Sequence, residues 1–102
     1  MSDVLARQRR RELRGSILRT ARLTYKDGAG VTLESIHHVA GRQWRTAEVE
    51  EETQYLVDLQ YLTREAGKRD ALDFEPPVVY RLTALGMKVL NGDHEDASID
   101  VR

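Results

Sequence analysis

The first 22 residues concentrate arginine in a pattern that could bind phosphate groups. This segment holds seven arginines against two acidic residues, Asp3 and Glu12. A guanidinium group offers a rigid fork of N–H donors that matches phosphate oxygens, and it stays charged at physiological pH. The segment could therefore contact the backbone of a nucleic acid. The candidate residues are Arg7, Arg9, Arg10, Arg11 and Arg14.

Two later segments carry the opposite charge. Residues 45–58 contain five carboxylates and one arginine, and residues 91–102 contain four carboxylates and one arginine. The whole chain has 16 basic and 17 acidic residues, so its formal net charge of -1 hides this uneven distribution. Such asymmetry indicates an electrostatic partner, either another molecule or a second copy of the chain. The alternative interpretation is that these charges only solvate helix faces.

Other chemistry has little support in the sequence. The chain has no cysteine, which excludes disulfides, thiolate catalysis and cysteine-based metal centres. The spacing of serine, histidine and carboxylate residues does not indicate a catalytic set. We therefore expect that the chain is not an enzyme and that it has no catalytic residue, no cofactor and no metal site. His37 and His38 would point about 100° apart on a helix, so we expect one to be half-buried and the other exposed. No apolar run approaches the ~18 residues of a membrane span, and the expected location is the cytoplasm.

Hydrophobic spacing predicts the helix that must carry the first arginines. Leu13, Ile17 and Ala21 recur every fourth residue within a polar, arginine-rich context. This period predicts an amphipathic helix over residues 6–25, buried on one side and basic on the other. The length of 102 residues supports a single domain with one modest core.

Two further helices are expected in the middle of the chain. Thr32 is a good N-cap for a short helix that ends at Gly41. Thr46 offers a second N-cap, and apolar residues continue at helical spacing from there to about Tyr61. Trp44 lies in the turn between these helices, where we expect it to cover their corner. The alternative is an exposed anchor for a partner.

The period of the sequence changes after the third helix. Residues 62–66 and 77–82 predict two strands of a hairpin with a long polar tip. Thr83 is expected to cap a final short helix that Asn91 and Gly92 terminate. Residues 92–102 are expected to form a flexible acidic tail. The predicted fold class is α+β, mainly α, with one domain over residues 1–91 followed by this tail.

Three helices followed by a β-hairpin resemble a winged helix-turn-helix domain. Residues 80–90, Tyr-Arg-Leu-Thr-Ala-Leu-Gly-Met-Lys-Val-Leu, resemble the exit from the wing in MarR- and PadR-like regulators. In those regulators the aromatic residue and the position of Leu82 pack the wing onto the core, and the position of Thr83 caps the next helix. The resemblance covers residues 10–91. It implies three helices, a wing of two or three strands and a short C-terminal helix.

The resemblance also implies DNA binding. The third helix would enter the major groove by its N-terminal end, and the wing would touch the backbone or the minor groove. Arginine can bind guanine or phosphate, and glutamine can pair with adenine. By position, the groove-facing candidates are Arg42, Gln43, Arg45 and Thr46, and the wing-tip candidates are Lys68 and Arg69.

The third helix departs from the family pattern because carboxylates crowd its first two turns. Glu48, Glu50, Glu51 and Glu52 would face a polyanion. Each like-charge pair at about 4 Å costs on the order of 1 kcal/mol in water. The DNA contacts are therefore expected from the basic first helix and the wing rather than from the third helix.

The expected function is that of a winged-helix protein that binds double-stranded DNA. Such a chain would act as a small transcriptional regulator or as an accessory protein of a phage or mobile element, and it would form a homodimer. The alternative is a winged-helix adaptor that does not touch DNA. In that case the acidic third helix would bind a basic protein, or the arginine-rich N-terminal segment of a second copy.

Overall fold

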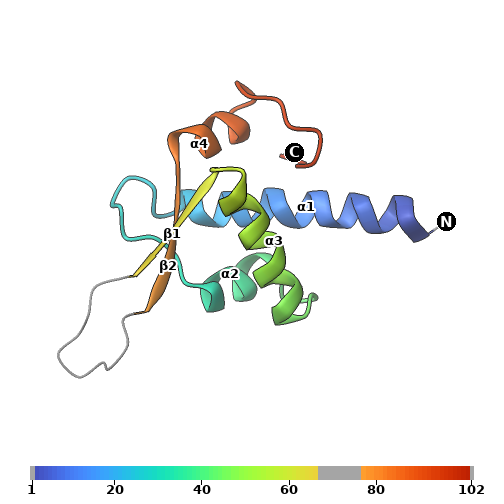
Figure 1. Cartoon of the computed structure of the whole chain (residues 1–102), viewed down its shortest axis with the longest axis horizontal. Coiled ribbons are helices and arrows are strands. Elements are labelled where there is room, and N and C mark those ends of the chain that lie inside the picture. The colour runs from blue at the N-terminus through green and yellow to red at the C-terminus, as the bar shows by residue number, and fades with distance from the viewer. Residues whose placement is uncertain (1, 67–76, 102) are drawn as a thin grey trace.

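A long N-terminal helix runs along the longest axis of the molecule, and the other elements pack along its second half (Figure 1). The computed structural model describes residues 2–66 and 77–101. Within these ranges the elements are α1 (Ser2–Arg22), α2 (Leu33–Ala40), α3 (Thr46–Asp58), β1 (Leu62–Ala66), β2 (Val78–Leu82) and α4 (Ala84–Leu90). They form a mainly helical α+β domain with a two-stranded antiparallel sheet, which confirms the predicted fold class at this level.

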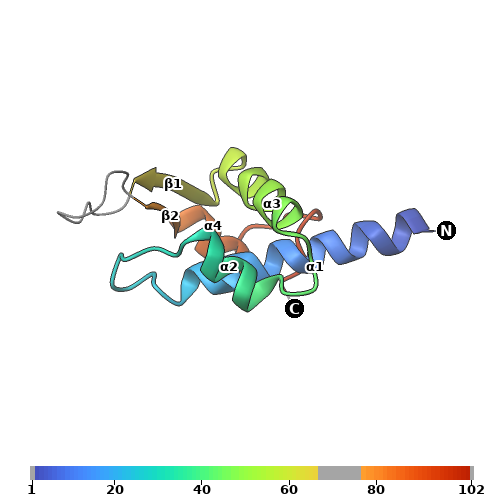
Figure 2. The same ribbon diagram turned by 90° about the horizontal axis from the view of Figure 1, so that it is seen from below.

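The predicted apolar stripe of α1 lies in the core. Leu13, Ile17 and Ala21 are all buried there. The helix begins at Ser2 rather than at residue 6, and it ends at Arg22 rather than at residue 25. Its first turns extend beyond the other elements (Figures 1 and 2). Among the helices of residues 2–66 and 77–101, none combines the length and the apolar character needed to cross a membrane.

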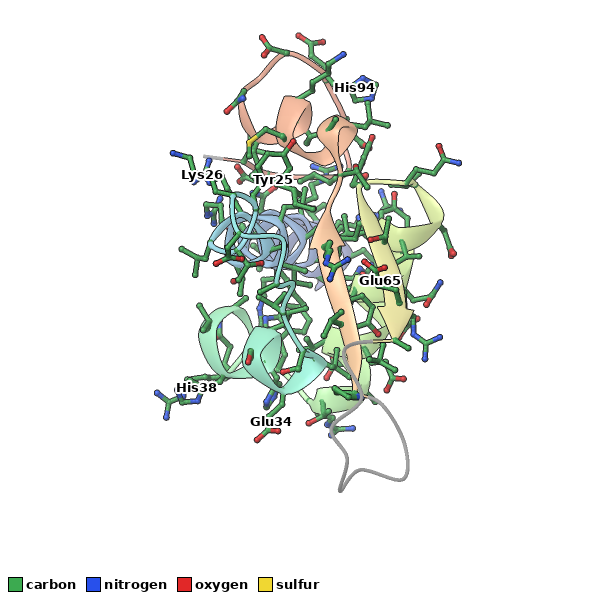
Figure 3. The ribbon with its side chains drawn as sticks, turned by 90° about the vertical axis from the view of Figure 1, so that its left-hand side faces the viewer. Tyr25, Lys26, Glu34, His38, Glu65 and His94 are labelled. Atoms are coloured by element: carbon green, nitrogen blue, oxygen red, sulfur yellow. The ribbon has the colours of Figure 1, made fainter. Side chains whose placement is uncertain are left out.

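The second helix begins and ends where the sequence predicts. The Thr32 hydroxyl accepts a hydrogen bond from the backbone N–H of Ser35 at 3.1 Å, as an N-cap should. At the other end, the N–H of Gly41 donates to the carbonyl of His37 at 3.1 Å. His37 is half-buried and His38 is exposed, as expected; Figure 3 shows His38 pointing outward from α2.

The third helix differs from its prediction at both ends. Its N-cap is Arg45, with φ −69° and ψ 147°, and no side chain makes a capping hydrogen bond. The predicted Thr46 cap is wrong because the extended backbone falls one residue earlier, so that Thr46 is already helical. The helix ends at Asp58 rather than near Tyr61. The reason is that Gln60 adopts a left-handed backbone, with φ 67°, which turns the chain into β1.

The hairpin has the predicted pairing and one additional connection. Leu62 pairs with Leu82, and Ala66 pairs with Val78, in antiparallel register. Val31, just before α2, forms a bridge to the central residue of β2. The N–H of Val31 donates to the carbonyl of Tyr80 at 2.8 Å, and the reverse bond measures 2.7 Å. A third extended segment therefore ties the α1–α2 connection to the sheet.

The fourth helix follows the sequence prediction. The Thr83 hydroxyl accepts a hydrogen bond from the N–H of Gly86 at 3.0 Å. Asn91 is the C-cap, and Gly92 follows with a φ of 80° that a glycine adopts without strain.

The C-terminal segment, residues 93–101, packs against α1 (Figure 1), which differs from the expected flexible tail. Ile99 is only 7% exposed and belongs to the core. The N–H of Asp100 donates to the carbonyl of Arg11 at 3.0 Å, and Arg14 Nη1 donates to the carbonyl of Ser98 at 2.9 Å. The acidic composition predicted a loose tail, but burial of one apolar side chain, Ile99, is enough to hold this polar segment on the core.

A hydrogen-bond cluster also fastens the C-terminal segment to α3 and to the start of the sheet. The Tyr61 hydroxyl donates to Asp96 at 2.6 Å, and the Tyr55 hydroxyl donates to Ser98 Oγ at 2.9 Å. Burial, as the largest cause, and the hydrogen bond to Asp96 together raise the pKa of Tyr61 to about 12. Burial also acts to raise the pKa of Asp96. Hydrogen bonds from Ser98 and Tyr61 outweigh that effect and hold the pKa below its ordinary 3.8.

We expect a Tyr61→Phe substitution to change how stability depends on pH. At neutral pH the lost hydrogen bond should lower the free energy of unfolding by about 1 kcal/mol. Because the Tyr61 pKa is raised from 10.0 to about 12, the wild-type protein loses stability as pH rises through that window, and the variant lacks this loss. The lowered pKa of Asp96 means that its carboxylate stabilises the folded state above pH 3.8, and this stabilisation disappears as pH falls through the folded-state pKa. The variant lacks the hydrogen bond from Tyr61 to Asp96, so it should lose less stability in acid.

Urea unfolding midpoints between about pH 3 and pH 11 would check this expectation. A constant difference between the two proteins over the whole range would contradict it. Because the two proteins differ only at position 61, the difference between their midpoints isolates the Tyr61 hydroxyl.

Candidate nucleic-acid interface

A contact between Arg9 and Trp44 joins two basic segments that are distant in sequence. The Arg9 guanidinium lies 4.9 Å from the centre of the Trp44 ring, within the range of a cation–π interaction. Trp44 lies in the turn between α2 and α3, where it is half-buried and packs against the core. The Trp44 backbone carbonyl is 2.8 Å from His37 Nε2, and the Trp44 backbone N–H donates to the carbonyl of Gly41 at 2.9 Å. The turn between α2 and α3 is thereby held beside the first half of α1 (Figure 2).

This contact gathers most of the predicted DNA-binding arginines at one end of the molecule. We call this group the basic end, and it consists of Arg7, Arg9, Arg10, Arg11, Arg42 and Arg45. Arg11 is half-buried and the other five arginines are exposed. None of them forms a salt bridge with another described residue, since the ion pairs of the described chain involve Arg14 and Arg81. Gln43 and Thr46 are exposed in the same region.

Arg14 differs from the other predicted DNA contacts because its donors are used inside the protein. It forms a two-point contact with Glu52, through Nη2 at 3.1 Å and Nε at 3.3 Å. Its guanidinium also lies 4.0 Å from the centre of the Tyr55 ring and donates to the carbonyl of Ser98. The side chains of Arg14 and Glu52 are only 15% and 9% exposed. Arg14 is therefore a structural residue, and Glu52 is removed from the predicted protein-binding set for the same reason.

The outward face of α3 is acidic. Its exposed residues include Glu50, Glu51 and Asp58, and no basic residue lies within the helix. Glu48 is half-buried and borders a groove between α1 and α3 that Arg10 also lines. This face would repel a polyanion, because each phosphate approaching a carboxylate to about 4 Å costs on the order of 1 kcal/mol even in water.

The hairpin is a separate surface from the basic end. The described strands lie at the end of the molecule opposite to the start of α1 (Figure 1). The two predicted wing-tip residues, Lys68 and Arg69, lie outside the described residues. The expectation that the first helix and the wing share the DNA contacts therefore remains a prediction.

The structural role of Arg14 has a signal in the sequence that charge counting missed. Arg14, Leu18 and Ala21 follow one another at spacings of four and three residues, which places the arginine on the buried face. The contact between Arg9 and Trp44 has no comparable signal, because it depends on how the α2–α3 turn folds back. Within the described ranges, no group of three or more histidine, aspartate and glutamate side chains is arranged to hold a metal ion.

Comparison of the chain with protein-family models, with curated proteins and with solved structures found no match.

Proposed function

We propose that this chain is a winged helix-turn-helix protein that binds double-stranded DNA through the basic end. The order of elements supports the fold assignment, since α1, α2 and α3 are followed by a hairpin and a short helix. The isolated bridge between Val31 and Tyr80 supports it further, because it sets a short extended segment beside β2 of the two-stranded sheet, where a wing of three strands would have its third strand. Such a protein would act where it meets genomic or phage DNA, as a regulator or an accessory factor.

The observation that carries this proposal is the stacking of Arg9 on Trp44. It brings the arginines of α1 beside the turn that leads into α3. In a helix-turn-helix the N-terminal end of this helix faces the major groove, and neighbouring elements contact the phosphates. Arg7, Arg10 and Arg11 are therefore suited to phosphate contacts. Arg42, Gln43, Arg45 and Thr46 are suited to the base edges nearest the turn.

The acidic face of α3 limits how deeply this helix can enter a groove. The N-terminal end of a helix carries a partial positive charge, so this end and the turn before it attract an anion. Beyond the first turn, Glu50 and Glu51 are exposed and repel one. DNA contacts are therefore confined to the start of the helix, with backbone contacts providing most of the affinity. The sequence preference should accordingly be weak.

The salt dependence of DNA binding tests this proposal. We expect the wild-type chain to bind a mixed-sequence duplex at about 50 mM salt, with log affinity falling by about 0.9 per log unit of salt for each phosphate contacted. Replacing Arg7, Arg10 and Arg11 with glutamine, which leaves the contact of Arg9 with Trp44 in place, should reduce this slope by about 2.7. Fluorescence anisotropy of a labelled duplex between about 50 and 200 mM salt measures both quantities.

A variant with Arg22, Lys26 and Lys88 replaced by glutamine is a matched control. It removes the same amount of charge from exposed positions outside the basic end, and Lys26 lies at the end of the molecule that faces the viewer in Figure 3, opposite to the start of α1. The control should keep the wild-type slope. If both triple variants lose the same salt slope, DNA is attracted by the surface charge as a whole and not by the basic end. If the wild type does not bind the duplex at about 50 mM salt, the proposal is refuted.

The acidic face of α3 favours a second candidate function, in which the chain binds a basic protein surface. A second copy of this chain offers such a surface in its basic end. The two candidates respond in opposite ways to replacement of Glu50 and Glu51 with glutamine. DNA affinity should rise if DNA is the ligand. The mass measured by light scattering should fall if these residues hold a homodimer together.

A further inference from the structure

Four arginines of α1 line one groove together with the C-terminal segment. Arg7, Arg10, Arg11 and Arg14 follow the spacing i, i+3, i+4 and i+7, which places them on one face of the helix. Ala97 and Ser98 lie across from them and complete the lining of a groove of about 330 Å³. This volume is about ten times the roughly 30 Å³ that a water molecule occupies in the liquid, so a phosphate group fits inside.

The charges around this groove are not balanced by the residues that line it. Arg14 is paired with Glu52, so it contributes a fixed side chain but little net charge. Arg7, Arg10 and Arg11 form no salt bridge with another described residue. Like charges at these spacings repel one another on a helix, and an anion between them relieves the repulsion.

The nearby carboxylates of the C-terminal segment are engaged elsewhere. Asp96 accepts hydrogen bonds from Tyr61 and from Ser98. Asp100 accepts one from Gln8 at 2.9 Å, and neither carboxylate lines the groove. The lining of this groove therefore holds no carboxylate, although Arg10 also borders the neighbouring groove that Glu48 and Glu51 line.

The walls of the groove are held in place by contacts on both sides. Arg14 is fixed by Glu52, by the Tyr55 ring and by the carbonyl of Ser98. The opposite wall is fastened because Ser98 bonds to Tyr55 and to Asp96. A site with fixed walls loses little side-chain freedom when it binds a ligand, so more of the interaction appears as affinity.

We propose that this arginine groove binds a phosphate group. Guanidinium groups bind phosphate oxygens through paired, charge-assisted hydrogen bonds, and three cations around one groove suit a multiply charged oxyanion better than a halide. The phosphate can belong to the backbone of a DNA duplex, in which case the inference rests on the proposed function. It can instead belong to a free anion such as inorganic phosphate or pyrophosphate.

The first experiment uses pyrophosphate and the full chain. At pyrophosphate concentrations about ten times its dissociation constant, the thermal unfolding midpoint should rise by about 5 °C over sodium chloride of equal ionic strength. The variant Arg7→Gln/Arg10→Gln alters two exposed side chains and should lose this rise. The control Arg22→Gln/Lys26→Gln should keep it. Arg22 lies about 12 Å along the helix from Arg14, outside the groove.

A duplex-binding experiment with the same variants distinguishes the two sources of phosphate. Loss of the pyrophosphate effect together with weaker duplex binding, by about tenfold or more, assigns the groove to the DNA backbone. Loss of the pyrophosphate effect with unchanged duplex affinity assigns it to free anions. A pyrophosphate effect in a wild-type chain that binds no duplex supports the groove and refutes the proposed function. If pyrophosphate and chloride act alike on the wild type, or if the groove variant keeps the full rise, the groove proposal is overturned.

Discussion

A Glu52→Ala substitution is expected to lower the free energy of unfolding by about 2 kcal/mol, because it leaves the partly buried Arg14 without its counter-charge. Glu52 accepts two hydrogen bonds from the Arg14 guanidinium, and both side chains are largely shielded from solvent. Arg14 also contacts the Tyr55 ring and the carbonyl of Ser98. Loss of Glu52 therefore weakens the junction of α1, α3 and the C-terminal segment at the same time.

Urea unfolding of single and double variants of the pair would measure this effect. Arg14→Ala alone should cost a similar amount, and the double substitution Arg14→Met/Glu52→Met should recover most of the loss, because apolar side chains replace both charges. Glu51→Ala, at the exposed neighbouring position, is the control and should change stability by no more than about 0.5 kcal/mol. Equal effects at positions 51 and 52 would show that the ion pair does not stabilise this junction.

A Gly15→Ala substitution is expected to destabilise the protein, although alanine is the better helix former. Gly15 lies inside α1, where the exchange would ordinarily gain about 1 kcal/mol. Here the added Cβ would collide with the backbone carbonyl of Asp100. The C-terminal segment must then move away and expose Ile99, whose burial contributes roughly 1.5–3 kcal/mol. With the lost hydrogen bonds of the segment, the net loss should be about 2 kcal/mol.

The same substitution in a chain that ends at Gly92 is a direct control. Without residues 93–102 the collision is absent, so Gly15→Ala should stabilise the shortened chain by up to about 1 kcal/mol. Amide hydrogen exchange of the full-length variant should show faster exchange at Asp100, whose N–H is bonded to Arg11 in the wild type. A full-length variant more stable than the wild type would contradict the packing of the C-terminal segment. The variant should also lose the pyrophosphate effect, because one wall of the groove has moved.

The elements that depend on a few neighbouring residues could be predicted from the sequence. Thr32 and Thr83 cap their helices because the bonded N–H lies only three residues further along. The strands of the hairpin have the predicted positions because apolar and β-branched residues mark them locally. The Thr46 cap is wrong because the extended N-cap backbone lies at Arg45, although arginine is not a residue type that favours this position.

The packing of the C-terminal segment could not be predicted from local pattern. Its composition is acidic, and only Ile99 and Val101 are available for burial. The segment is bonded to α1, more than eighty residues earlier in the chain, through the N–H of Asp100 and the carbonyl of Arg11. Such contacts have no period in the sequence, so charge counting favoured a loose tail.

The sequence by itself determined the uneven distribution of charge and the helices and strands that carry it. Only the tertiary structure decided which charges are available to a partner. Arg14 and Glu52 are engaged with each other, whereas Arg9 is stacked on Trp44 and adds the α2–α3 turn to the basic end. The physical reason is that residue type and spacing determine charge and helix formation locally. Burial, by contrast, depends on segments that are distant in the chain and meet only when it folds.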